Sequence, residues 1–428
     1  MASPDSNPPS GLLKDMLRLA LSAGMVQGVA LLALPVLQRW YYGPEAFAEF
    51  SLYSQWAGLL GAIATLRMDL AVVHHVEERM ARAAWQNGLR ALLAVSLSAA
   101  VMALLLDAAG FAMGQVDGLW LWLPLGVGAI GLGSMATAIL SRDRHFGAIA
   151  TLRGAGGLLG EALRFASAGL GHSGLIAGRI AGQWWTALGA LRKVRTMWSP
   201  EQAPQQADRR AAWKFDIDYV RFTTPANLLA MAANALLILF LFERAPVEFT
   251  GQVGAALAYL TVAAGLVIRS VSDVFFRHLR DVTPGRLRAF YLRWSAGLLV
   301  ASTAGIGLLF AFPDEWGIAL LGERWRRMWP AMRWLSLWMP FWISASALSG
   351  IFPYLRRQSW SFGLDVLHLA LVAGWIWTWS EAQPDILASP NWTLLKEYAG
   401  LQGGFYALAI GVGIHLTGQP AKGRPADP

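Results

Sequence analysis

The sequence predicts an all-α polytopic membrane protein with about twelve transmembrane helices in two pseudo-symmetric six-helix lobes. Of its 428 residues, 55% are hydrophobic and only 14% are charged, whereas about 25% are charged in an ordinary soluble chain. Apolar runs recur from residue 17 almost to the C-terminus, and the basic residues between them alternate in density from loop to loop. These three observations indicate that lipid, not water, covers most of the folded chain.

A helix that crosses a bilayer needs roughly 20 largely apolar residues. The predicted spans of the first half are 17–37, 47–66, 89–106, 119–140, 154–170 and 174–191, and those of the second half are 222–242, 251–268, 294–312, 332–352, 362–379 and 398–416. The first run is too long for the core of a cleaved signal peptide, so it is predicted to be a retained span. The fifth is interrupted by Glu161 and Arg164.

The distribution of Lys and Arg predicts the orientation, because loops on the cytoplasmic side carry an excess of them. If the N-terminus is cytoplasmic, the outside loops hold only Arg39, Arg244, Arg324, Arg326, Arg327 and Lys396. All the denser basic clusters then lie inside, including the one in the long stretch 192–221. Both termini are therefore predicted to face the cytoplasm.

Several function classes are disfavoured. The net charge of +8 resides in short loops and not on a soluble face, so no nucleic-acid partner is expected. The chain has no cysteine, and its Gly-rich stretches lack a Lys-Ser/Thr ending, so neither thiol chemistry, an ATP site nor another cofactor is expected. His74, His75, Glu77 and Glu78 lack the spacing that places two imidazoles on one helical face, which predicts a solvated loop and no metal site.

An internal repeat divides the chain. Residues 44–67 align without a gap on 246–269, matching Pro44 with Pro246, Phe47 with Phe249 and Arg67 with Arg269. The two segments follow spans one and seven, as expected for a duplicated six-helix unit whose halves insert in parallel. The predicted domains are an N-terminal lobe, 1–195, a cytoplasmic connector, 196–221, and a C-terminal lobe, 222–428.

Seven stretches, in order along nearly the whole chain, resemble the oligosaccharide flippases of the polysaccharide-transporter branch of the multidrug/oligosaccharidyl-lipid/polysaccharide (MOP) superfamily. They are GPEAFAEFSLY (43–53), ATLRMDLAV (64–72), GLIAGRIAGQ (174–183), DYVRFTTPANLL (218–229), VSDVFFRHLRD (271–281), LLGERWRRMWPAMRWLS (320–336) and ALSGIFPYLRRQ (347–358). The resemblance implies two lobes around a central cavity that opens alternately to either side.

The resemblance also implies a function that is not enzymatic. The expected activity is flipping of an undecaprenyl-diphosphate-linked repeat unit for O-antigen (lipopolysaccharide), capsule or exopolysaccharide, in the bacterial inner membrane. Membrane lipids, a polysaccharide polymerase and glycosyltransferases are the expected partners besides this lipid-linked glycan.

Arginines at membrane depth are the main candidate substrate ligands, because a diphosphate needs cations and a guanidinium donates several hydrogen bonds to phosphate. Arg67 and Arg269 are predicted to meet the diphosphate as pseudo-symmetric partners, or else to snorkel to the interface. Arg164 lies three residues after Glu161, so a structural ion pair is the alternative for it. Arg179 lies within a stripe of Gly174, Gly178 and Gly182, which is typical of close helix packing.

Polar residues in other spans are weaker candidates. Gln27 and Asn234 could hydrogen-bond sugar hydroxyls or simply bond to neighbouring helices. Asp365 and His368 lie three residues apart in the eleventh span, as a proton-coupling pair or as a polar contact between helices.

Three other functions are alternatives, and each usually comes with a feature that this sequence lacks. A cation-coupled multidrug exporter shares the fold but usually carries an acidic residue in the cavity of its first half, commonly in the first span, and 17–37 has none. A membrane polysaccharide polymerase or ligase usually has a large outer loop, whereas the longest here, around 313–329, is short. A flippase of peptidoglycan precursors usually has two additional spans.

Overall fold

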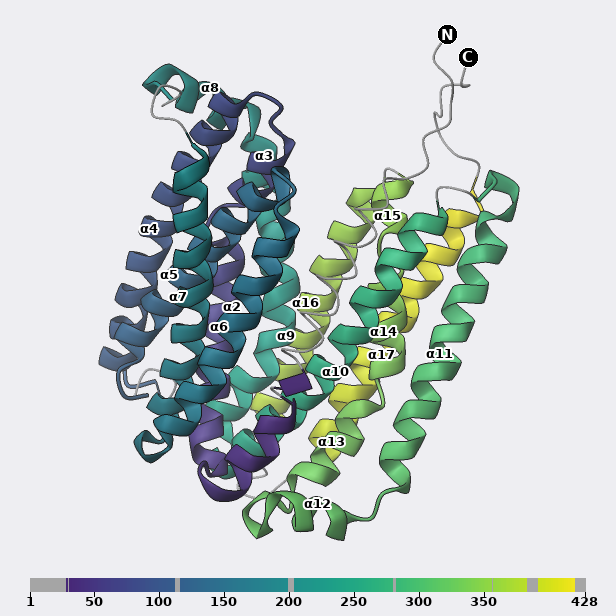
Figure 1. The fold of residues 1–428 in the computed structure, drawn as a ribbon. Helices are drawn as coiled ribbons and strands as arrows, with labels where there is room; N and C mark the ends of the chain where they lie inside the picture. The colour runs from purple at the N-terminus through teal and green to yellow at the C-terminus, as the bar shows by residue number, and fades with distance from the viewer. Residues whose placement is uncertain are drawn as a thin grey trace. The chain divides into compact units, whose positions relative to one another are not determined.

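The computed structural model describes residues 28–29, 31–111, 116–198, 204–279, 282–355, 357–382 and 392–419. Within these ranges the chain is helical and contains no β-strand, which confirms the predicted all-α membrane architecture (Figure 1). The chain divides into two compact units, Met1–Ala235 and Leu236–Pro428. The predicted connector and lobe boundaries remain a prediction.

The first unit is a bundle in which α5 packs against α2, α4 and α7, and α6 packs against α7 (Figure 1). A helical segment at 31–40 comes first. It is followed by α2 (Pro44–Ile63), α3 (Met68–His74), α4 (Glu78–Ala108), α5 (Leu119–Arg142), α6 (Phe146–Ala166), α7 (His172–Met197), α8 (Gln206–Phe215) and the start of α9 (Thr224–Arg244). Short turns of 3-10 and π-helix lie at Ala168–Leu170 and Tyr219–Thr223. The short helices α3 and α8 lie at one end of the bundle, called here the connector end (Figure 1).

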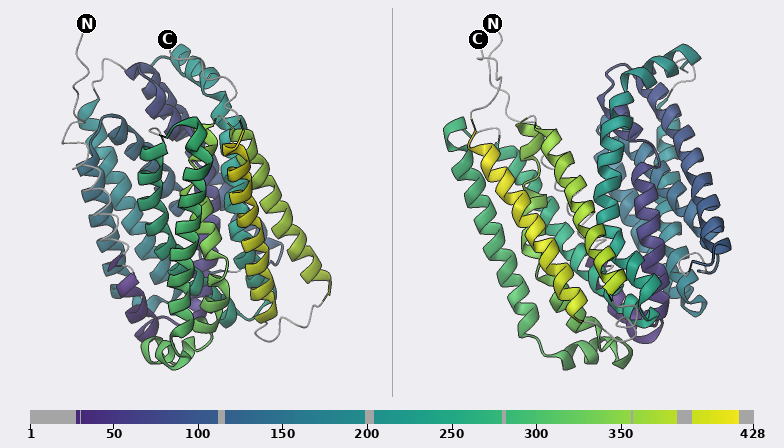
Figure 2. Two further views of the ribbon diagram at one scale, coloured as in Figure 1. Left: turned by 90° about the vertical axis from the view of Figure 1, so that its right-hand side faces the viewer. Right: turned by 180° about the vertical axis from the view of Figure 1, so that it is seen from behind.

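The second unit contains α10 (Val247–Leu279), α11 (Leu287–Ala311), α12 (Asp314–Leu321), α13 (Met328–Ser336), α14 (Met339–Ala347), α15 (Ile351–Tyr354), α16 (Gln358–Ala382) and α17 (Trp392–Thr417). Aromatic side chains fill its core, including Phe275, Tyr291, Trp338 and Tyr406. Trp338 stacks on Tyr406 with the ring centroids 5.7 Å apart. Long, nearly parallel or antiparallel helices dominate this unit in each view (Figure 2).

The described helices account for the predicted spans. Every span from 47–66 onward falls on a helix or on a bent pair of helices, and the first span lies mostly outside the described residues. Among the described residues, seven helices are long and apolar enough to cross a membrane, and up to nine spans result if each of two bent pairs counts as one. α6 and α7 are outside that number and carry charged residues such as Glu161, Arg164 and Arg179.

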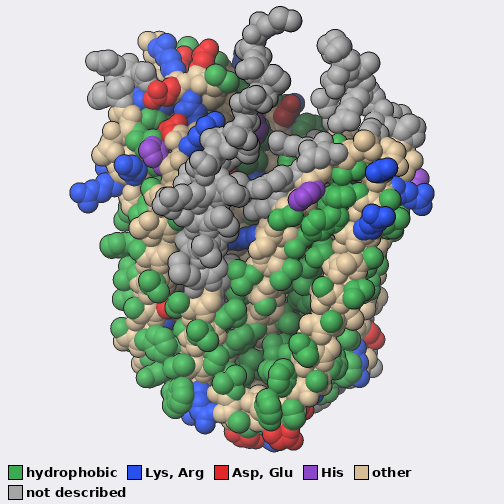
Figure 3. Space-filling model, turned by 45° about the vertical axis from the view of Figure 1, so that its right-hand side comes forward, with side chains coloured by type: hydrophobic (Ala, Val, Ile, Leu, Met, Phe, Trp, Pro, Cys, Tyr) green, Lys and Arg blue, Asp and Glu red, His purple; other side chains and the backbone are tan. Residues whose placement is uncertain are grey.

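The surface has the polarity that a membrane requires. Hydrophobic side chains cover the middle of the helices in view, whereas charged side chains gather toward the two ends (Figure 3). In the most apolar 18-residue stretch of each helix, only 17% of the stretch in α4 and 6% of that in α11 is buried inside the protein. Apolar side chains that are left exposed on this scale are expected where lipid is the solvent.

The predicted glycine stripe of α7 is confirmed as a close helix contact. A Cβ atom at Gly182 would lie 2.4 Å from the carbonyl oxygen of Gly156 on α6, and one at Gly160 would lie 3.0 Å from that of Gly178. A Cβ atom at Gly178 would also lie 2.5 Å from Cγ of Arg164. Only glycine lets the two backbones approach so closely and leaves a path for the arginine stem between them.

We expect Gly182→Ala to destabilise the protein by about 1 to 3 kcal/mol, because the new methyl group overpacks the contact between α6 and α7. The unfolding temperature of the purified protein in detergent measures this. Gly154→Ala is the matched control, since a Cβ atom at Gly154 meets nothing within 4 Å. Equal unfolding temperatures for the two variants would contradict the close contact.

Candidate functional site

Two arginines converge on one aromatic ring inside the first unit. Arg164 lies in the last turn of α6, and Arg179 lies two turns into α7. Their guanidinium carbons lie 5.2 and 5.7 Å from the ring centroid of Phe50 on α2. Both distances are within the range of cation–π attraction. Phe50, Ser54, Glu161, Arg164 and Arg179 are called here the Phe50 centre.

The predicted pair of Arg164 with Glu161 is confirmed. Nη1 of Arg164 donates to Oε1 of Glu161 at 2.7 Å, and Nε donates to the carbonyl oxygen of Leu175 at 3.4 Å. The Tyr42 hydroxyl donates to the backbone oxygen of Arg164 at 2.6 Å, which fixes the end of α6. Arg164 is only 9% exposed, so its charge depends on Glu161 for compensation.

Arg179 gives the Phe50 centre an excess of positive charge. Its Nη1 donates to the Ser54 hydroxyl at 3.0 Å, and the side chain is half-buried. A guanidinium has five N–H donors, and this is the one that Arg179 uses within the described part of the chain. With two arginines and one glutamate, the centre has a net charge of +1 and unused donors to offer an anion.

Arg67 lies at a break between α2 and α3, which bend by 43°. Leu66 and Arg67 both have left-handed backbones, with φ of 49° and 60°, a conformation that side chains other than glycine rarely adopt. Asp69 stabilises the break by accepting hydrogen bonds from Thr65 at 3.1 Å and Ser134 at 3.0 Å. The buried Nε of Arg67 has no hydrogen-bond partner among the described residues.

The structure does not give Arg269 the same local setting as Arg67. Helix α10 continues without a break from Val247 through Arg269 to Leu279, and the Arg269 side chain is exposed. Although Arg67 and Arg269 are aligned in the sequence repeat, their backbone conformations therefore differ. Their shared role toward a diphosphate remains a prediction.

Of the two predicted sugar-binding amides, the structure describes only Asn234, which bonds within its own helix. Asn234 is exposed, and its Nδ2 donates to the carbonyl oxygen of Ala230 in its own helix at 2.8 Å. Gln27 lies outside the described residues.

Asp365 and His368 share one face of α16, but the imidazole is bonded elsewhere. His368 is buried, and its Nε2 lies 2.8 Å from Oε1 of Gln402 on α17. Its ring also stacks on Phe405, with centroids 4.1 Å apart. This geometry holds α16 against α17, while Asp365 stays half-buried one turn away.

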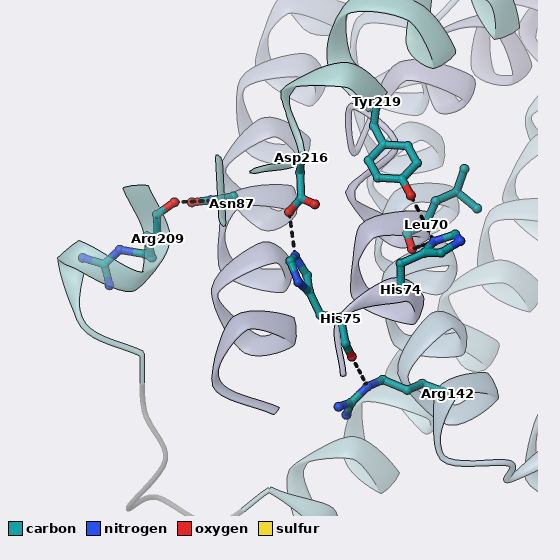
Figure 4. Close-up of polar contacts among 8 residues, drawn as sticks. All are labelled: Leu70, His74, His75, Asn87, Arg142, Arg209, Asp216 and Tyr219. Carbon is teal, nitrogen blue, oxygen red and sulfur yellow. Dashed lines mark hydrogen bonds and ion pairs between the residues drawn. The ribbon is translucent and has the colours of Figure 1, made fainter. Parts of the chain in front are cut away.

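The loop that contains His75 was expected to be solvated, and that expectation is wrong for His75. The ring is 8% exposed and lies 2.9 Å from Asp216, which is 1% exposed and follows α8 (Figure 4). Arg142 donates to the carbonyl oxygen of His75 at 3.2 Å, and the Tyr219 hydroxyl lies 3.1 Å from Nδ1 of His74. The segment after α8 folds back onto the loop and shields the His75 ring from water, while His74, Val76 and Glu77 remain exposed.

Sequence patterns could not reveal the junction between the His75 loop and the α8 region, because the contacts of His74, His75 and Asn87 with residues 209–219 join positions more than 100 residues apart. The junction also includes Asn87, whose Nδ2 donates to the backbone oxygen of Arg209 at 3.0 Å (Figure 4). In the described ranges, no group of three or more His, Asp or Glu side chains is placed to hold a metal ion.

Comparison with solved structures identifies the fold. The chain matches a structure titled "Lipid II flippase MurJ, inward closed conformation" with a TM-score of 0.67 and 12% identity, covering 94% of this chain and 86% of that one. It matches the inward-facing conformation of a multidrug resistance MATE family transporter of the MOP superfamily with a TM-score of 0.60 and 14% identity, over 93% of both chains.

A MOP superfamily transporter from Pyrococcus furiosus matches with a TM-score of 0.57 and 13% identity, over 95% of this chain and 97% of that one. No protein-family model and no curated protein sequence matches the chain. The structural matches show that the chain has the fold of MOP superfamily transporters, a class of multi-pass membrane proteins.

We expect Glu161→Gln to destabilise the protein by about 3 to 5 kcal/mol, because it leaves the Arg164 charge buried and unpaired. The double variant Glu161→Gln/Arg164→Gln should be more stable than Glu161→Gln alone. Thermal or denaturant unfolding in detergent measures both. Glu323→Gln is the control, because the pair of Glu323 and Arg326 has the same spacing but is well exposed, at 64% and 63%. A Glu161→Gln variant as stable as the Glu323→Gln control would contradict this account.

Proposed function

We propose that this protein is a flippase that moves an undecaprenyl-diphosphate-linked oligosaccharide from the inner to the outer leaflet of the bacterial cytoplasmic membrane. It acts by alternating access and supplies repeat units for O-antigen, capsule or exopolysaccharide synthesis. Both termini face the cytoplasm in this proposal. Glycosyltransferases build the substrate before this step, and a polysaccharide polymerase uses it afterwards.

The observation that carries the proposal is the positive charge of the Phe50 centre. A diphosphate leaves water only if donors and cations replace its hydration, and arginine offers both. If the Phe50 centre bound cations for export, it would instead need an uncompensated carboxylate of its own. The one carboxylate of the Phe50 centre, Glu161, is paired with Arg164 at 2.7 Å. The structural match to a lipid II flippase supports a lipid-linked substrate.

The proposed direction of transport needs no nucleotide. A negative diphosphate that moves out of a negative cell interior gains roughly 2.3 kcal/mol per charge for each 100 mV of membrane potential. The membrane potential alone would therefore favour outward movement of the negatively charged diphosphate.

A multidrug exporter of the same fold is the second candidate. It is favoured by the match to a multidrug resistance transporter over 93% of both chains. The two candidates differ in the charge of what they carry, and this makes them separable by genetics.

Deletion of the gene should abolish a surface polysaccharide while its lipid-linked unit accumulates on the cytoplasmic face. Extraction and mass spectrometry of the lipid-linked glycans, with and without a membrane-impermeant label on intact cells, measure this. A deletion strain with normal surface glycans and new sensitivity to cationic dyes would favour the exporter.

Complementation of the deletion strain tests the residues. Removing one charge-assisted contact costs about 1.5 to 3 kcal/mol of substrate interaction, which corresponds to a loss of flux of roughly tenfold or more. We expect Arg179→Ala to show this loss and Arg179→Lys to keep part of the flux, because lysine keeps the charge without the planar donors. Flux is scored per inserted molecule, with the exposed Arg192→Ala on the same helix as control. Normal flux in Arg179→Ala would remove Arg179 from the substrate path.

A further inference from the structure

A basic groove lies between α4 and α8 at the connector end of the first unit, outside the Phe50 centre. It encloses about 590 Å³. Its lining includes four cationic side chains, Arg90, Arg209, Arg210 and Lys214, and contains no acidic residue. We call it the α4–α8 groove.

The positive charge of this groove is not neutralised by the protein. Asp208, the acid nearest in sequence on α8, pairs instead with Arg79 at 2.9 Å. Arg90, Arg210 and Lys214 are exposed and form no ion pair within the described part of the chain. Arg209 donates from Nη1 to the side-chain oxygen of Gln86 at 3.1 Å, and its buried Nε has no partner among the described residues. The arrangement is suited to an anion.

The surface that continues from the groove along α4 is apolar. Leu93, Leu97, Val101 and Leu104 follow Arg90 at intervals of three or four residues, so they share its helical face. They are 66%, 68%, 55% and 50% exposed. An extended hydrocarbon chain could lie along this stripe while its anionic head group contacts Arg90.

The α8 helix has the composition of a segment that lies in a membrane interface. Its basic side chains are interleaved with Trp213 and Phe215, which are 36% and 74% exposed. Basic residues with exposed aromatic neighbours favour the head-group region of an anionic leaflet. Small residues on α4, Ala91 and Ala94, leave room for the head group beside them.

From these observations we propose that the α4–α8 groove binds an anionic phospholipid of the leaflet at the connector end, with the phosphate held by Arg90, Arg209, Arg210 and Lys214 and one acyl chain along α4. A free phosphate or nucleotide would use the basic residues but would not extend onto the apolar stripe that continues from them along α4. The bound lipid would join α8 to α4 beside the contacts of Asp208 with Arg79 and of Asn87 with Arg209. This site does not depend on which substrate is transported.

Native mass spectrometry of the full-length protein, titrated with phosphatidylglycerol or phosphatidylcholine in detergent, tests the proposal. We expect phosphatidylglycerol to bind more tightly, and Arg210→Gln/Lys214→Gln to weaken it by roughly tenfold or more, since each basic residue near an anionic lipid contributes several-fold. The matched control is Arg192→Gln/Lys193→Gln, which removes the same charges from exposed positions on α7. Thermal unfolding without added lipid establishes that both variants are folded.

The lipid tail is tested separately from the phosphate. The double variant Leu93→Gln/Leu97→Gln should weaken the binding of phosphatidylglycerol without changing the binding of inorganic pyrophosphate. Three results would overturn the proposal: equal binding of the two phospholipids, equal losses in the groove and control variants, or pyrophosphate that binds the groove as tightly as phosphatidylglycerol. The last of these would identify a site for free phosphate compounds.

Discussion

Taking a charged side chain out of water costs several kcal/mol unless it is paired, so charges that are buried in a folded protein must be compensated or used. The first unit compensates Arg164 with Glu161 at 2.7 Å and surrounds Asp69 with the hydroxyls of Thr65 and Ser134. Arg179 has a hydroxyl and an aromatic ring as neighbours but no carboxylate of its own. Its uncompensated charge, next to a paired one, is what the proposed role in anion transport rests on.

The glycines of α6 and α7 are the structural condition for this charge arrangement. The backbones of the two helices approach so closely that a Cβ atom at Gly178 would lie 2.5 Å from Cγ of Arg164. Bulkier residues would separate the helices and move the two guanidinium groups away from Phe50. The residues that pack the helices and the residues that carry the charge therefore cannot be varied independently.

Much of the fold could be predicted from the sequence, because span length and loop charge are local properties. The pair of Glu161 and Arg164 and the packing of Gly182 also follow from helical spacing. The break at Leu66 and Arg67 could not be predicted, since the aligned segment around Arg269 continues as one helix. Nor could the contact of His75 with Asp216, because a pairing across 141 residues depends on how the connector folds back.

If the first unit holds a site for an anionic diphosphate, equilibrium binding of a lipid diphosphate should reveal it. Geranylgeranyl diphosphate, a short lipid diphosphate, can be titrated into the purified protein in detergent, with the cationic dye rhodamine 6G as the comparison ligand. We expect saturable binding of the diphosphate. Arg179→Gln should weaken this binding by roughly tenfold or more, as expected for the loss of one charge-assisted contact, and Arg192→Gln should leave it unchanged. Tight binding of the dye together with no saturable binding of the diphosphate would contradict this expectation.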